Sequence, residues 1–225
     1  MKDNIDWGKA NQIIGEGLYS GLAKVLMEVS HRQLARFGNR NSKDNPSILE
    51  IGAGRGEHFD FVKNDFSQYV MSDISTWGKS TIDEIIKKDK RVSFEIQDIE
   101  ELTFTDETFD RVICSCVLIH VDQPYLALGE LNRVTRSGGT ISLYIAADPG
   151  VLLRLIRFIV TAPKMKKLDV PYDLINALSH RNNAGGLIEM CKFVFKDSKM
   201  KISYHPFRIK SWNFSTHIIV NIIKN

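Results

Sequence analysis

The chain shows two kinds of hydrophobic pattern, one with helical spacing and one made of short uninterrupted apolar runs. Apolar residues recur at helical spacing over about residues 8–38, and a polar linker runs from Gly38 to Pro46. The apolar runs that follow have the length of buried strands, and helix-compatible segments separate them. Strands that alternate with helices up to about residue 147 indicate a parallel sheet with helices on both faces. The runs are 47–51, 69–74, 92–97, 109–117 and a fifth that begins after Gly139.

The last third of the chain divides into a helix, an irregular stretch, a second helix and two strands. Asp148, Pro149 and Gly150 precede the first of these helices and mark its beginning. The expected bounds are 151–161 for the first helix, 164–181 for the irregular stretch, 182–195 for the second helix, and 200–207 and 213–223 for the strands.

A glycine turn follows the first strand. Glycines at positions 52, 54 and 56 let the backbone adopt positive φ and let a ligand approach without a Cβ in the way, and a helix is expected to begin near Gly56. A dinucleotide fingerprint, G-x-G-x-x-G, needs its third glycine one position later, where this chain has Glu57. The turn therefore favours a ligand without a pyrophosphate, such as S-adenosylmethionine. The alternative is a strand-to-helix corner that needs glycine only for packing.

Acidic residues follow the second and third strands. Asp73 lies nineteen residues after Gly54, where a nucleotide-binding βαβ unit returns a carboxylate to the hydroxyls of a ribose. Asp98 follows the third strand. Because aspartate is also a frequent turn former, a capping role is the alternative for Asp98.

These segments together resemble the class I S-adenosylmethionine-dependent methyltransferases, most closely the small-molecule branch that is similar to quinone-biosynthesis methyltransferases. The resemblance covers about residues 46–147. Its motifs are E/D-x-G-x-G-x-G at 50–56, the acids at 73 and 98, F-D-x-V at 109–112 and E-x-x-R-V-L-x-P-G-G at 130–139. In the last motif, Thr135 and Ser137 stand where leucine and proline are usual.

The resemblance implies a fold, a cofactor and its contacts. The implied fold is a Rossmann-like α/β fold, with a seven-stranded, mostly parallel sheet whose last strand is antiparallel. The implied cofactor is S-adenosylmethionine. The resemblance also implies that the backbone around Gly52 and Gly54 faces the methionine moiety, Asp73 the ribose hydroxyls, and Asp98 with the Ile99 amide the adenine, with Val117 in the pocket wall after the fourth strand. The other implied cofactor contacts are Glu50, Ala53 and Ile74.

Length and composition agree with one α/β domain, since 225 residues with 43% hydrophobic content suffice for one core. We expect an amino-terminal helical cap at 1–45, a cofactor-binding core at 46–147, a substrate lid and helix at 148–195, and a hairpin of strands at 196–225. The sequence has no apolar run long enough to span a bilayer, and its first residues are polar. A cytoplasmic protein without a transmembrane segment is expected.

The net charge of +3 conceals an asymmetry along the chain. Residues 1–150 carry 17 basic and 23 acidic side chains, whereas residues 151–225 carry 13 basic and 4 acidic ones. A basic last third indicates an anionic partner, such as a phosphate group, a nucleic acid or a membrane surface. The alternative is a solvated face that keeps the protein soluble.

Several chemistries are not expected. Cys114, Cys116 and Cys191 are an odd number without metal-ligand spacing, which favours reduced structural thiols. The segment after the fourth strand lacks the Asn/Asp-Pro-Pro-Tyr/Phe loop of enzymes that methylate bases or glutamine, so a nucleic-acid substrate is not expected. Asp122 and Asp148, the acids near the fourth and fifth strands, are expected as caps, and no metal is expected.

The candidate general bases are histidines. His120, just past the fourth strand, and His180, in the expected lid, could take a proton from an acceptor hydroxyl, although a purely structural role is the alternative for His120. Candidate substrate contacts are Tyr19 and His31 in the amino-terminal helices and Arg154 and Arg181 in the lid. For His31, which has apolar neighbours at helical spacing, a satisfied buried histidine is the alternative.

The sequence thus predicts methyl transfer from S-adenosylmethionine to a small molecule. A hydroxyl of a saccharide or nucleotide-sugar is favoured, because an anionic or glycan-bearing acceptor suits the basic last third, and because the segments 180–183 and 204–208 resemble methyltransferases of cell-surface saccharide biosynthesis. The first alternative is a lipid or quinone acceptor met at a membrane surface, with the helix at 151–160 as the peripheral apolar contact. The second is a regulatory protein that binds the cofactor without catalysis.

Overall fold

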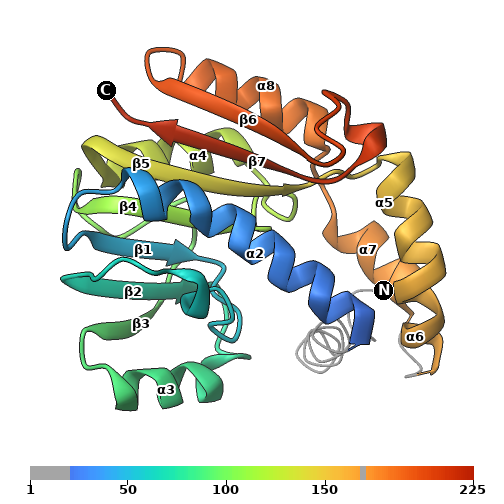
Figure 1. Cartoon of the computed structure of the whole chain (residues 1–225), viewed down its shortest axis with the longest axis horizontal. Coiled ribbons are helices and arrows are strands. Elements are labelled where there is room, and N and C mark those ends of the chain that lie inside the picture. Colours follow the sequence, from blue (N-terminus) through green and yellow to red (C-terminus); the bar gives the residue numbers. More distant parts are fainter. Residues whose placement is uncertain (1–20, 168–170) are drawn as a thin grey trace.

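The computed structural model describes residues 21–167 and 171–225 and contains one seven-stranded sheet (Figure 1). The strand order is β3-β2-β1-β4-β5-β7-β6, in which β1 to β5 are parallel and β7 is antiparallel to both β5 and β6. The strands are β1 (Ser47–Ile51), β2 (Gln68–Asp73), β3 (Val92–Ile96), β4 (Phe109–Ser115), β5 (Thr135–Ala146), β6 (Lys199–Pro206) and β7 (Ser215–Ile223). The predicted Rossmann-like fold with an antiparallel last strand is confirmed.

Helices cover both faces of the sheet, as predicted. On one face, α4 (Pro124–Val134) and α8 (Ala184–Val194) bury their apolar sides against the sheet. On the other face, Leu34 of α2 (Gly21–Asn41) and Ile82 of α3 (Lys79–Lys88) belong to a second apolar cluster. Central β1 lies between the two clusters and is buried along its whole length. The order of the strands reverses between β1 and β4, and ligands of open α/β sheets bind at the carboxyl ends of the strands beside such a point.

Two connections differ from the predicted alternation of helices and strands. After β1, the chain forms only a 3-10 turn at Phe59–Phe61 where a helix was expected to begin near Gly56. Phe59 of this turn packs edge-on against Tyr69 of β2, which belongs to the apolar cluster on this face of the sheet. Between β3 and β4, the described chain has no helix either.

Side chains of α4 hold the connection between β3 and β4 in place of a helix. The Arg133 guanidinium donates to the carbonyl oxygens of Leu102 (2.9 Å) and Phe104 (2.7 Å), and Glu130 accepts the Leu102 amide (2.9 Å). Glu130 and Arg133 are the acidic and basic positions of the E-x-x-R motif, so this motif has a structural role here.

Helical structure also extends further than the sequence predicts. α2 ends at Asn41, so the predicted linker begins later. The helix that begins at Val151 runs as α5 (Val151–Ile156), a π-helical turn (Arg157–Thr161) and α6 (Ala162–Lys167), and α7 (Tyr172–Ser179) follows where irregular chain was expected. Proline at 163 and 171 concealed this pattern, because Pro163 lies just after the wider turn and Pro171 is the cap of α7. Among the described residues, no helix has the length and hydrophobicity needed to cross a membrane.

A buried arginine joins α2 to the sheet. Arg111 of β4 is fully buried, and its guanidinium donates to Asn39 Oδ1 (2.9 Å) and to the Ala35 carbonyl (3.2 Å). The guanidinium lies against Gly38, where an added Cβ would come within 2.2 Å of Arg111 Nε. Only glycine therefore lets α2 approach this side chain.

The first prediction tests this contact. Gly38→Ala should lower the free energy of unfolding by about 2 kcal/mol, because the new methyl group displaces a buried guanidinium. Gly129→Ala is the matched control, since Gly129 lies on the exposed side of α4 with open space around it, and alanine there should stabilise the helix by about 0.5–1 kcal/mol. Urea unfolding measures both changes. Equal stabilities of the Gly38 variant and the wild type would contradict the packing described.

Candidate active site

The glycine turn after β1 has the predicted backbone. Gly52, Gly54 and Gly56 have φ of 73°, 57° and 83°. An added Cβ at Gly52 would lie 2.2 Å from Val117 Cγ2, and one at Gly56 would lie 2.8 Å from Ile85 Cδ1. The turn therefore excludes side chains at these two positions and brings Val117, from the loop after β4, into contact with its backbone.

Asp73 at the end of β2 connects the glycine turn to the next loop. Its Oδ2 accepts the Gly54 amide (3.1 Å), and its Oδ1 accepts the Ser75 amide (3.1 Å). Ile74 and Ile96, at the ends of β2 and β3, are 71% and 61% exposed. A carboxylate beside a turn free of side chains, with exposed aliphatic surface next to it, fits a nucleoside such as that of S-adenosylmethionine.

Two other predicted cofactor contacts have structural partners. Glu50 is buried and accepts a hydrogen bond from the Tyr69 hydroxyl (2.6 Å), and burial raises the pKa of Glu50 to about 7. Asp98 is exposed, and its Oδ1 accepts the Glu100 amide (2.9 Å). This hydrogen bond is the turn-capping role that the sequence offered as the alternative to an adenine contact. Ala53 and Ile99 are both buried.

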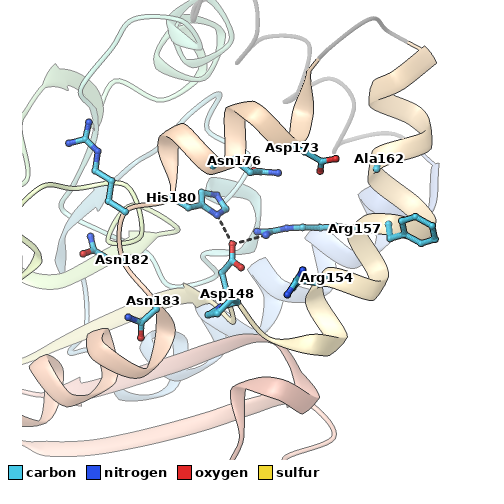
Figure 2. Close-up of a pocket in the computed structure, with 13 residues that line it drawn as sticks. Asp148, Arg154, Arg157, Ala162, Asp173, Asn176, His180, Asn182 and Asn183 are labelled. Carbon is cyan, nitrogen blue, oxygen red and sulfur yellow. Dashed lines mark hydrogen bonds and ion pairs between the residues drawn. The ribbon is translucent and has the colours of Figure 1, made fainter. Parts of the chain in front are cut away.

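A second group of polar residues lies beyond the end of β5 (Figure 2). Asp148 Oδ2 accepts hydrogen bonds from His180 Nδ1 (2.6 Å) and from Arg157 Nη1 (2.7 Å). These two partners hold the pKa of Asp148 well below its usual range. The prediction that Asp148 is a helix cap is wrong, because Gly150 is the cap of α5. The Asp148 carboxylate instead joins the π-helical turn at Arg157–Thr161 to His180, just after α7.

The group lines a cavity of about 550 Å³ that opens between α5 and α7. Figure 2 shows Arg154, Asn176 and Asn182 from three segments around the pair formed by Asp148 and His180. The described lining residues are Asp148, Pro149, Arg154, Arg157, Phe158, Ala162, Asp173, Asn176, Ala177, His180, Arg181, Asn182 and Asn183.

The segment 180–182 is bound to the loop after β4. The amides of Arg181 and Asn182 both donate to the Ile119 carbonyl (2.9 and 3.2 Å), and Asn182 Nδ2 donates to the carbonyls of Leu118 (2.9 Å) and Val121 (2.7 Å). Because Val117 of the same loop contacts the glycine turn, one loop connects the cavity with that turn.

Both predicted histidines lie in this region. The rings of His120 and His180 have centroids 5.0 Å apart, and His120 Nδ1 lies 3.1 Å from the Ser179 carbonyl. Desolvation lowers the pKa of His120. His180 differs from His120 in having a carboxylate partner.

The predicted substrate contacts are only partly brought together. Arg154 and Arg181 line the cavity, and Arg181 forms an ion pair with Asp122, which is therefore not the cap that was expected. His31 is buried elsewhere, against His58, and burial lowers its pKa to about 4. Tyr19 lies outside the described residues.

The sequence did not single out Asn182 or the pairing of Asp148 with His180. The available signals were the position of Asp148 directly after a strand, at the carboxyl end where ligands bind, and the polar run from His180 to Asn183.

Comparisons with known proteins agree with this geometry. Residues 49–143 match the family model described as a methyltransferase domain. A demethylmenaquinone methyltransferase from Clavibacter sepedonicus is 32% identical over 132 residues, 57% of this chain and 54% of that protein. A phosphatidylethanolamine N-methyltransferase from Cereibacter sphaeroides is 28% identical over 142 residues, 57% of this chain and 64% of that protein.

Other relatives share shorter segments or the fold alone. An uncharacterized methyltransferase from Schizosaccharomyces pombe is 44% identical over 61 residues, 26% of this chain and 22% of that protein. The matched segments thus span between 22% and 64% of the lengths of the curated relatives. The structure of a putative S-adenosylmethionine-dependent methyltransferase from Methanococcus maripaludis has a TM-score of 0.66 at 16% identity, covering 100% of this chain and 97% of that one.

The second prediction concerns the buried Glu50. Because its pKa is raised to about 7 in the folded protein, its contribution to stability is present below about pH 4.5 and is lost as the pH rises through 7. Glu50→Gln keeps an acceptor for Tyr69 and cannot ionise. The unfolding free energy of the wild type, minus that of the variant, should therefore fall between pH 4.5 and pH 7.

Urea unfolding at a series of pH values measures this difference. Lowered carboxyl pKa values elsewhere, such as that of Asp148, are common to both proteins and cancel. A difference that stays constant with pH would show that Glu50 does not bind its proton more tightly in the folded state.

Proposed function

We propose that this protein transfers a methyl group from S-adenosylmethionine to a small-molecule acceptor held in the cavity beside Asp148, because residues 49–143 match the model of a methyltransferase domain. The observation that carries the proposal is the hydrogen-bonded pair of Asp148 and His180. The pair lies in a cavity that one loop connects to the glycine turn.

The cofactor-binding residues are assigned by position. Asp73 would accept hydrogen bonds from the ribose hydroxyls, and the backbone of Gly52 and Gly54 would face the methionine moiety. When bound, S-adenosylmethionine supplies an electrophilic methyl group. The chain must then orient the acceptor, exclude water and remove a proton where the acceptor is a hydroxyl.

His180 is the proposed general base. A carboxylate is only an acceptor, so the bond to Asp148 places the proton of the neutral ring on Nδ1 and leaves Nε2 able to accept. The acceptor hydroxyl would lose its proton to Nε2 as its oxygen forms the bond to the methyl carbon, while the bond from that carbon to sulfur breaks and the demethylated cofactor leaves as a neutral thioether. Asp148 then stabilises the imidazolium, and Arg157 keeps Asp148 ionised.

The acceptor chemistry follows from the cavity wall. Arg154 and Arg181 contribute positive charge, and Asn176, Asn182 and Asn183 contribute amide groups. Such a wall suits a hydroxyl-rich or anionic molecule, so we favour a saccharide or nucleotide-sugar hydroxyl. In this proposal residues 148–195 form the acceptor lid over the cofactor-binding core.

A second candidate acceptor is an amphiphile, such as a lipid or a quinone. An apolar groove of about 990 Å³ shares Phe158, Ala162 and Asp173 with the polar cavity and continues along Ile159 and Leu174. An acceptor with a polar reacting end and an apolar tail would occupy both. The relatives named for demethylmenaquinone and phosphatidylethanolamine support this candidate.

The third prediction tests cofactor binding. Asp73→Ala should weaken the binding of S-adenosylmethionine by about 2 kcal/mol, because a charged acceptor for two hydroxyls is removed. The affinity of Asp73→Asn for S-adenosylmethionine should lie between those of Asp73→Ala and the wild type. Asp44→Ala, in the exposed loop before β1, is the matched control and should bind like the wild type. Calorimetry measures the dissociation constants, and an unchanged value for Asp73→Ala would show that the ribose is held elsewhere.

The fourth prediction tests the base. We expect His180→Gln to lower turnover by about 100-fold or more while the affinity for S-adenosylmethionine stays within about twofold of the wild type. His120→Gln, which changes the neighbouring ring, should have a smaller effect. Transfer of a labelled methyl group is measured with sugar phosphates, nucleotide-sugars, reduced quinones and phosphatidylethanolamine.

Each outcome of this assay has a clear reading. A larger loss for His120→Gln than for His180→Gln would reverse the assignment of the base. Turnover of sugar substrates that falls as salt is added would support the anionic acceptor, and turnover of the quinone or lipid would support the amphiphile. Cofactor binding without turnover of any acceptor in the panel would support a regulatory protein.

A further inference from the structure

A basic groove lies between α2 and β6, with β7 as its floor. Its volume is about 600 Å³. The described lining residues are Gln33, Arg36, Phe37, Arg40, Asn41, Lys201, Ile202, Ser203, Tyr204, His205, Arg208, Lys210, Ile219 and Asn221. Five of these are lysine or arginine, and none of the described lining residues is acidic. No described residue lines both this groove and the cavity beside Asp148.

Helical spacing on α2 and strand alternation on β6 place the basic side chains on the sides that face the groove. Arg36 and Arg40 are one helical turn apart on α2, so both side chains lie on the same face. On β6, alternate residues face opposite sides of the sheet, and Met200, Ile202 and Tyr204 pack against the core cluster under α8. Lys201 and His205 therefore lie on the open side, opposite Asn221 and His217 of β7.

The basic side chains of the groove have no acidic partner among the described residues. Within residues 21–167 and 171–225, none of the five basic side chains forms an ion pair: Arg36, Arg40, Lys201, Arg208 and Lys210. Two like charges one turn apart destabilise a helix, and a positive cluster repels itself. The arrangement therefore lowers the stability of the fold, and an anion bound in the groove would offset the repulsion.

Several polar groups could position such an anion. Ser203 and Asn221 carry donors beside the cationic side chains. His217 at the end of the groove floor is held by Gln33 Oε1 (2.7 Å) and is stacked on His205, with ring centroids 5.0 Å apart. The floor is thus fixed, and the cationic groups surround it.

We propose that this groove is a binding site for a phosphate-bearing ligand with at least two negative charges. Arginine recognises phosphate oxygens through two parallel hydrogen bonds, and the groove has three arginines from two walls. Its volume suits a small molecule or a single head group rather than a polymer. The phosphate can come from a soluble diphosphate or from the head group of an anionic lipid, and the site is independent of the methyl-transfer cavity.

The test uses the full chain and two probes. Calorimetry measures binding of inorganic pyrophosphate, and co-sedimentation measures binding to vesicles of phosphatidylglycerol, with phosphatidylcholine vesicles as the neutral reference. The double variant Arg36→Gln with Lys201→Gln should weaken binding of the responding probe by about tenfold or more. A second double variant, Arg40→Gln with Lys210→Gln, should give a similar loss, since both pairs line the same groove.

Lys88→Gln with Lys90→Gln is the matched control. It removes the same charge from exposed lysines at the end of α3 and should bind like the wild type. All variants change exposed side chains, and their dissociation constants for S-adenosylmethionine should stay within about twofold of the wild type, which separates this site from the cofactor site.

The outcomes decide the proposal and the source of the phosphate. Pyrophosphate binding that both groove variants weaken assigns a soluble ligand, and vesicle binding with the same pattern assigns a lipid head group. The proposal is overturned if neither probe binds the wild type, or if the control variant loses as much as the groove variants.

Discussion

The carboxamide of Asn182 fixes how the two halves of the proposed active site relate to each other. It donates to the carbonyls of Leu118 and Val121, while the Ile119 carbonyl between them accepts two backbone amides from the same segment. His180 lies in the connection between α7 and α8, and the backbone of this connection is hydrogen-bonded to the loop that follows the central strand β4. Since that loop also reaches Gly52 through Val117, the position of His180 depends on the geometry of the glycine turn.

Three carboxylates show how the environment assigns different roles to one chemical group. Glu50 is buried beside a hydroxyl, and desolvation favours its neutral form. Asp73 accepts backbone amides at a strand end, where it joins two loops. Asp148 has a histidine and an arginine as partners, which favour its ionised form. Glu50 is part of the interior of the sheet, Asp73 lies at the carboxyl end of β2, and Asp148 lines the cavity between α5 and α7.

The sequence predicts what local pattern determines. The seven strands follow from apolar runs, and the glycine turn follows from residues that must adopt positive φ. It does not predict contacts between distant segments. Asp148 and His180 are 32 residues apart and meet only because α6, the end of the helix that begins at Val151, packs against α7. Likewise, the connection after β3 has no helix because Arg133, far along the chain, holds it. The roles of the predicted cofactor contacts remain predictions.

The π-helical turn at Arg157–Thr161 determines how the side chains before and after it are oriented around the axis of one continuous helix. A π-helical turn holds one residue more than an α-helical turn, and each residue advances the helix by about 100°. With the extra residue, Arg157 faces Asp148 while Met165, one segment later, is fully buried. A chain one residue shorter here would keep its helix but rotate one end against the other. Either Arg157 would then turn away from the cavity or Met165 would turn out of the core. The number of residues between these two positions is therefore constrained by both contacts.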